Sequence, residues 1–214
     1  MSKLKSTLPN MVLSLGIITI LSGLILGVMY SVTKEPIEAS ARRMQTEALA
    51  EVLPPFDNDP EAVMKRVEVD GKQFEIYPAE MDGRSVGAAV KGYSLDGFSG
   101  DIVLICGFDN EGNIVNYRVL KQAETPGLGA RMELWFRDPT AARSVIGRSP
   151  GQSRFIPAKD GGDIDGITAA TISSRAFLNI ISEAYEVYRE FSGDNDFNSS
   201  YKDSSTGASP RERH

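Results

Sequence analysis

The segment Asp160-Gly-Gly-Asp-Ile-Asp-Gly-Ile-Thr-Ala-Ala-Thr-Ile-Ser-Ser174 decides how the C-terminal half of this 214-residue chain folds, because it leads directly into a helix. That helix is predicted by one apolar stripe with spacings of three and four residues, formed by Phe177, Ile180, Ile181, Ala184, Tyr188 and Phe191. Four hydroxyl residues therefore lie at or beside the helix N-terminus: Thr168, Thr171, Ser173 and Ser174. Amide groups at such a terminus lack partners, and the helix dipole there favours an anion.

Three roles are open for these hydroxyl groups. The first is plain N-capping of the helix by Thr or Ser. The second is a calcium loop, suggested by the acidic, glycine-rich run, but placing Gly166 at the sixth loop position leaves Gly161 and Ile172 at ligand positions. The third is a phosphate held by backbone amides and hydroxyl groups, without any Lys or Arg.

A second glycine-rich segment, Glu124-Thr-Pro-Gly-Leu-Gly129, lies upstream and predicts a rigid loop. Proline fixes one φ angle, and the two glycines allow a positive φ and a close approach of the backbone to something flat or anionic. The alternative is a turn that only reverses the chain. Short helical pieces are expected after the loop, at 132–137 and 139–146.

Four strands are predicted before the loop, at 74–77, 85–93, 102–108 and 114–120. The third is continuously apolar, as a buried strand should be, and it contains Cys106, which we interpret as a small core residue. Strands followed by helices indicate the α+β class, with a small antiparallel sheet and flanking helices.

Residues 11–32 contain no charged residue and are long enough, as a helix, to span the roughly 30 Å core of a bilayer. A cleaved signal peptide is the alternative, but the apolar run exceeds the usual length of about 7–15 residues and no clean cleavage site follows it. The sequence therefore predicts a single transmembrane helix that stays in place.

The charges beside this helix predict its orientation. Lys3 and Lys5 precede it, whereas Lys34 after it is offset by Glu35. By the positive-inside rule, residues 1–10 stay in the cytoplasm and everything after the helix lies on the extracytoplasmic side of the inner membrane.

The rest of the chain divides into a stalk, a domain and a tail. The stalk helix, 33–55, is ended by the pair Pro54-Pro55, and its apolar face is formed by Ile37, Ala41, Met44, Ala48 and Val52. The domain covers 56–191, and 192–214 is rich in serine without periodicity, which indicates a disordered tail.

Composition excludes several classes of function. A net charge of −6 without a long basic stretch argues against nucleic-acid binding. A single cysteine excludes an internal disulfide, and a single histidine, His214, excludes a histidine zinc site or a Ser-His-Asp triad inside the fold. Redox chemistry would have to come from a cofactor.

Two segments together resemble the FMN-binding domain family. Asp165-Gly-Ile-Thr-Ala-Ala-Thr171 is similar to its flavinylation motif, Asp-x-x-Ser/Thr-Gly-Ala-Thr, and the 124–129 segment is similar to its ETPGLG signature. Two membrane complexes carry this domain: the Rnf electron-transport complex in its G subunit, and the sodium-translocating NADH:quinone reductase in its C subunit. The chain length favours the first of these, the Rnf protein.

The resemblance implies that FMN is joined through its phosphate to Thr171 by a flavin transferase, which takes FMN from FAD. The residues implied to surround the cofactor are Asp165, Gly166, Thr168, Ala169, Ala170 and Ser173 in one segment, and Glu124, Thr125, Gly127, Leu128 and Gly129 in the other. Ala169 replaces the motif glycine, and Gln122 stands where the family often has histidine. Trp135 or Tyr93 could hold the flavin ring, or both are ordinary aromatic residues.

The function implied is that of an electron carrier rather than a stand-alone enzyme. It would relay electrons between ferredoxin and NAD, coupled to ion translocation, and its partners would be the other subunits, the transferase and the lipid bilayer. The alternatives are a C-type subunit of the quinone reductase and a membrane-anchored sensor or scaffold without redox turnover.

Overall fold

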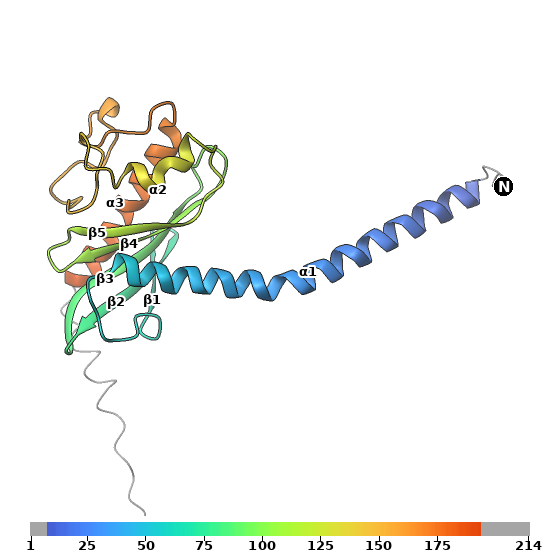
Figure 1. The fold of residues 1–214 in the computed structure, drawn as a ribbon, viewed down its shortest axis with the longest axis horizontal. Helices are drawn as coiled ribbons and strands as arrows, with labels where there is room; N and C mark the ends of the chain where they lie inside the picture. The colour runs from blue at the N-terminus through green and yellow to red at the C-terminus, as the bar shows by residue number, and fades with distance from the viewer. Residues whose placement is uncertain (1–7, 194–214) are drawn as a thin grey trace, which may run out of the picture. The chain divides into compact units, whose positions relative to one another are not determined.

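The structure, a computed structural model, describes residues 8–193 (Figure 1). Lys3 and Lys5, on which the predicted orientation depends, lie outside the described residues, as do His214 and most of the predicted tail. The described part forms two compact units, which meet in sequence between Gln45 and Thr46.

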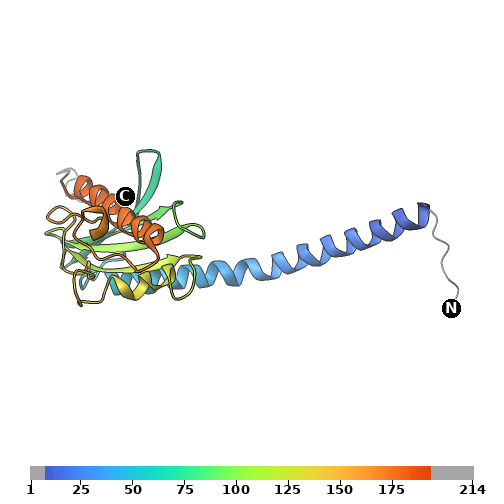
Figure 2. The same ribbon diagram turned by 90° about the horizontal axis from the view of Figure 1, so that it is seen from above.

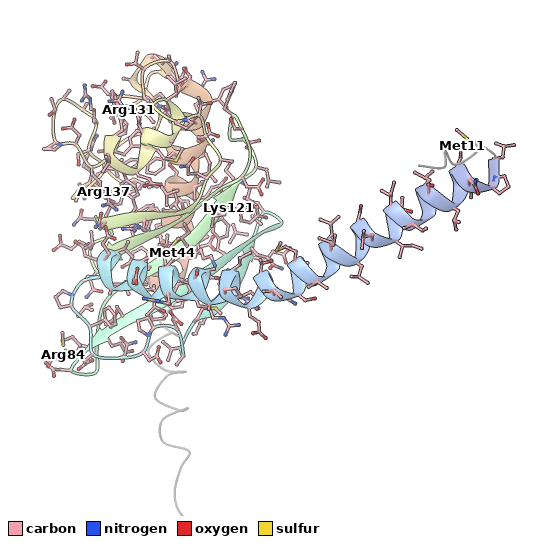
Figure 3. All side chains as sticks on the ribbon, turned by 45° about the vertical axis from the view of Figure 1, so that its right-hand side comes forward. Met11, Met44, Arg84, Lys121, Arg131 and Arg137 are labelled. Carbon is pink, nitrogen blue, oxygen red and sulfur yellow. The ribbon has the colours of Figure 1, made fainter. Side chains whose placement is uncertain are left out.

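Helix α1 (Leu8–Val52) begins the described chain and runs for 45 residues. It is long and apolar enough to cross a membrane once. Its Leu, Ile and Val side chains between 12 and 32 are all at least half exposed, and Figure 3 shows carbon-rich side chains projecting from every side of the helix. A helix that is apolar all round suits lipid rather than water.

The predicted apolar face of the stalk is correct only at its end. Ile37 and Met44 are 65% and 42% exposed, whereas Ala48, Leu49 and Val52 are buried. The helix also ends at Val52, before the two prolines. The reason is that only the last turns of α1 pack on the sheet. There Ala48, Leu49 and Val52 form a small core with Tyr77 and Ile105.

Five antiparallel strands form one sheet in which spatial order follows sequence order. They are β1 (Lys65–Val69), β2 (Lys72–Met81), β3 (Arg84–Ser94), β4 (Ile102–Asp109) and β5 (Ile114–Lys121). The four predicted strands are confirmed as β2 to β5, and the α+β class is confirmed. The edge strand β1 was missed, because its sequence is short and charged and its residues stay exposed or half-buried.

Both faces of the sheet are covered, which explains why β4 has no polar side chain before its last residue, Asp109. Ile102, Leu104, Cys106 and Phe108 pack in the larger core with helix α3 (Thr171–Gly193), and Ile105 packs on the opposite face with the end of α1. Figure 2 shows the sheet between these two helical segments. Cys106 is fully buried, and this burial raises the pKa of its thiol, so it is the core residue that the sequence predicted.

The connection between β5 and α3 is mostly irregular. It contains the turn η1 (Gly129–Arg131), the short helix α2 (Met132–Trp135) and the turn η2 (Ala158–Asp160). The helix expected at 139–146 is absent from this described segment. Ala141 has a φ of 56°, and Val145 N–H donates to Phe136 O instead of continuing a helix, so the chain turns back on α2.

Candidate functional site

The segment 165–171 forms a tight turn that ends at the start of α3. Ala170 N–H donates to Ile167 O at 3.0 Å, and Ala170 O accepts the first helical bond from Ser174 N–H at 3.0 Å. Ala169 between them has a φ of 61°. This is the position where the family motif has glycine, and for alanine the left-handed conformation costs about 1–2 kcal/mol.

The hydroxyl groups at this terminus do not act as plain N-caps. Ala170, at the cap position, has no side-chain oxygen, and Thr171 is already the first helical residue. Ser174 instead fixes the turn, since its Oγ accepts from Ile167 N–H and donates to Ala170 O, both at 2.8 Å. Thr168 is exposed. The helix terminus is therefore left with Thr171 as its foremost hydroxyl group.

A pocket of about 250 Å³ lies where the two predicted segments meet. Eight of the predicted site residues line it, and Phe98 and Ile172 complete the wall. The eight are Glu124, Thr125, Leu128, Gly129, Ala169, Ala170, Thr171 and Ser173. The other four, Asp165, Gly166, Thr168 and Gly127, lie outside this lining.

Glu124 connects the two walls of the pocket. Its side chain is 4% exposed, accepts from Ser173 Oγ at 2.5 Å and accepts from Ser99 N–H at 3.1 Å. The backbone of Gly129 passes close by: a Cβ atom there would lie 2.4 Å from Ser173 Oγ and 2.5 Å from Glu124 Oε2. Glycine at 129 is therefore required by the Glu124–Ser173 hydrogen bond.

Lys159 is a candidate site residue that sequence reasoning missed. Its Nζ donates to Thr171 Oγ1, so the expectation of an anion site without any Lys or Arg is wrong. Its neighbour Asp160 accepts two bonds from Arg175, Nε at 2.8 Å and Nη2 at 2.7 Å. The sequence signal for this contact was the charged pair Lys159-Asp160 directly before the two glycines. In the structure, the turn that contains this pair folds back on the N-terminus of α3.

Trp135 and Tyr93 do not line the pocket. Trp135 donates from Nε1 to Asp165 O at 2.8 Å, with guanidinium groups over its ring at 4.9 Å and 4.2 Å, from Arg131 and Arg143. Trp135 therefore supports the 165–171 segment from outside the pocket. Figure 3 places Arg131 by α2. Tyr93 lies in a separate hollow of the sheet, and the aromatic side chain at the pocket is Phe98, which is 67% exposed.

Replacing Trp135 with phenylalanine tests this support. We expect a loss of at least about 1 kcal/mol in the free energy of unfolding, because the hydrogen bond to Asp165 O disappears and the smaller phenyl ring leaves part of the indole volume unfilled. Chemical denaturation in detergent measures this change, with Tyr93→Phe as the control. A Trp135→Phe variant as stable as that control would show that the bond contributes nothing.

The ion pair with Arg175 should lower the pKa of the Asp160 carboxyl. The hydrogen bonds from Arg175 hold the pKa of the Asp160 carboxyl below its ordinary value of 3.8. Because this pKa is lower in the folded than in the unfolded state, the ion pair stabilises the fold at pH values above the ordinary pKa of the carboxyl. This stabilisation is lost as the pH falls through the folded-state pKa. We expect Arg175→Gln to raise the pKa of Asp160, as measured by NMR titration of its carboxyl carbon, and an unchanged pKa would contradict the ion pair.

Comparisons with known proteins place this site in a class. Residues 97–186, which contain both predicted segments and strands β4 and β5, match the model of the FMN-binding domain family. The fold and the pocket thus define an FMN-binding domain that follows a long apolar helix.

Similarity to curated proteins extends over most of the chain. It is 34% identical to the G subunit of the ion-translocating oxidoreductase complex of Haemophilus influenzae, over 77% of this chain and 82% of that protein. It is 32% identical to the G subunit of Cronobacter sakazakii, over 72% of this chain and 77% of that protein. It is 29% identical to the G subunit of Aliivibrio fischeri, over 86% of this chain and 91% of that protein. The chain belongs to this family of ion-translocating oxidoreductase G subunits, which confirms the resemblance seen in the sequence.

Proposed function

We propose that this chain is the FMN-carrying electron-transfer subunit of a membrane-bound, ion-translocating oxidoreductase, and that Thr171 carries the FMN through a phosphoester. The observation that carries the proposal is the position of Thr171. Its side chain is the foremost hydroxyl group of α3, lines the pocket formed by both motifs and has a lysine ammonium at its oxygen. The family membership supports the role as an FMN-carrying electron-transfer subunit, and the geometry supports Thr171 as the attachment site.

The residues of the pocket fit this cofactor by charge, and the volume of the pocket fits a part of it. The anionic phosphate suits the Thr171 end, where Lys159 and the helix dipole provide positive charge. The uncharged flavin ring suits the side formed by Phe98 and Leu128, next to the buried carboxylate of Glu124, which would repel a phosphate. A pocket of about 250 Å³ is smaller than the roughly 300–1,000 Å³ that encloses a whole drug-sized ligand, so part of the ring would stay exposed.

Such exposure suits electron exchange with a protein partner more than chemistry on a bound small substrate. FMN supplies one- and two-electron redox chemistry when bound, which the side chains of this domain do not. The chain's own contribution is to hold the phosphate at Thr171 and to keep the ring side of the pocket open. A covalent bond also prevents loss of the cofactor where no FMN pool can replace it.

The proposal includes a place in the membrane. Helix α1 would cross the bacterial inner membrane once, with residues 1–10 in the cytoplasm and the FMN-binding domain outside, as the positive-inside rule suggests. The other subunits of the complex and the lipid bilayer are its partners there. Within the complex, the chain would relay electrons between ferredoxin and NAD, and a flavin transferase would be needed during maturation.

The experiment is in-gel fluorescence after co-expression with a flavin transferase. The membrane fraction is denatured and separated by electrophoresis, and the gel is viewed under ultraviolet light. We expect a fluorescent band at the mobility of this chain. A dark band, with the transferase labelling a control substrate in the same cells, would refute covalent attachment and favour an anchored sensor or scaffold.

A further inference from the structure

The turn η2 brings a cation to the oxygen that the proposed function would esterify. Lys159 Nζ donates to Thr171 Oγ1, although the two residues are twelve positions apart in sequence. Lys159 is exposed and Thr171 is half-buried at the mouth of the pocket. An anion that approaches Thr171 from solvent would therefore meet the ammonium group of Lys159.

The position of this lysine is fixed by its neighbours. Asp160 makes its two hydrogen bonds with Arg175, which lies one helical turn after Thr171 and hence on the same side of α3. The turn itself is closed by a hydrogen bond from Ala158 N–H to Ile164 O at 2.7 Å. It is also tight, because a Cβ atom at Gly162 would lie 2.0 Å from Ile156 O. These three constraints hold Lys159 next to the N-terminus of α3.

We propose that Lys159 is the positioning residue that pairs with the phosphate joined to Thr171, and that the Asp160–Arg175 ion pair holds it in place. This inference rests on the proposed function, since it concerns the same phosphoester. It adds a residue outside both motifs.

The charges and atoms of the attachment step define what Lys159 does. The Thr171 hydroxyl displaces AMP from the phosphoanhydride of FAD: the bond from Oγ1 to phosphorus forms and the phosphorus–oxygen bond to AMP breaks. The hydroxyl proton passes to a base of the transferase, and nothing is oxidised or reduced. Lys159 donates first to Oγ1 and then to a free oxygen of the singly charged phosphodiester.

Removing the ammonium group should therefore slow attachment without unfolding the domain. A hydrogen bond between charged groups is worth enough to change a rate by about tenfold. An arginine at the same position keeps the charge and the donor groups, so it should restore most of the rate. The attraction between Lys159 and the anionic donor is also screened by salt, as expected for an exposed charge.

The test measures the initial rate of flavin incorporation into the full-length chain, in membranes supplied with purified transferase and FAD. The variants are Lys159→Met, Lys159→Arg and a matched control, Lys72→Met. Lys72 likewise contacts α3, but its partner is Glu183, twelve positions beyond Thr171. Rates are taken at low and high salt, and thermal unfolding is recorded for each variant.

We expect Lys159→Met to incorporate flavin about tenfold more slowly than the wild type at low salt and to lose part of the salt dependence. Lys159→Arg should recover most of the rate, and Lys72→Met should match the wild type. Equal rates for Lys159→Met and Lys72→Met would overturn the role of Lys159 while leaving attachment intact. A slow Lys159→Met that arginine does not rescue would also overturn it, whereas a wild type that takes up no flavin would refute the proposed function itself.

Discussion

Replacing Thr171 with alanine is expected to abolish the covalent flavin completely. The alanine side chain has no oxygen to form the phosphoester, and the other hydroxyl groups nearby have different positions or partners. Ser173 and Ser174 are buried and bonded to Glu124 and Ala170, and Thr168 lies outside the pocket lining. The measurement is flavin fluorescence of the denatured chain relative to the amount of protein.

Two control variants make this result specific. Thr171→Ser keeps a hydroxyl group at the helix terminus and should retain flavin, although with a less restricted rotamer. Ser182→Ala removes a hydroxyl group farther along α3, outside both motifs, and should leave attachment unchanged. Fluorescence that persists in Thr171→Ala would place the flavin elsewhere. An intact function of the complex without any covalent flavin would support the alternative of a sensor or scaffold.

Replacing Gly107 with alanine is expected to lower the free energy of unfolding of the domain by about 3 kcal/mol. Gly107 lies in β4 on the face that receives the end of α1, and a Cβ atom there would lie 1.9 Å from Val52 O. The two backbones cannot separate easily, because Glu51 next to Val52 is bound by Arg118 at 2.7 Å and by Arg137 at 3.0 Å. The alanine would therefore push the last turn of α1 off the sheet.

The matched control is Gly71→Ala. Unlike Gly107, Gly71 has a left-handed conformation that favours glycine, with a φ of 75°, but no atom would lie within 4 Å of a Cβ added there. Its replacement should lower the free energy of unfolding by only about 1–2 kcal/mol, which is the cost of the left-handed backbone conformation for alanine. Chemical denaturation of both variants in detergent gives the two values. A Gly107→Ala variant no less stable than Gly71→Ala would contradict the close contact between β4 and α1.

The elements with strong local patterns were predictable from the sequence. Strands β2 to β5 have β-branched and apolar residues separated by turn residues, and α3 has one apolar stripe on an otherwise polar helix. The edge strand β1 was not predictable, because its formation depends on pairing with β2 rather than on burial of its own side chains. The stalk was only partly predictable, since its periodicity continues beyond the few residues that the sheet covers.

The candidate site shows the same limit. Glu124, Gly129 and Thr171 were found because they lie in two motifs, and the structure brings them to one pocket. Lys159 was missed because its contact with Thr171 depends on how a twelve-residue connection folds back. The role of Trp135 was left open between holding the flavin ring and an ordinary aromatic residue, because composition identifies an aromatic residue without showing what it contacts; the structure gives it a hydrogen bond to Asp165 O.

The most direct test of the proposed phosphoester is mass spectrometry of the peptide 160–175 from the flavin-loaded chain. Trypsin cleaves after Lys159 and after Arg175, and no other Lys or Arg lies between them, so one peptide holds the whole motif. The proposal predicts a mass increase equal to one FMN less one water, with fragment ions that place it on Thr171. An unmodified peptide, or a flavin located on Thr168, Ser173 or Ser174, would contradict it.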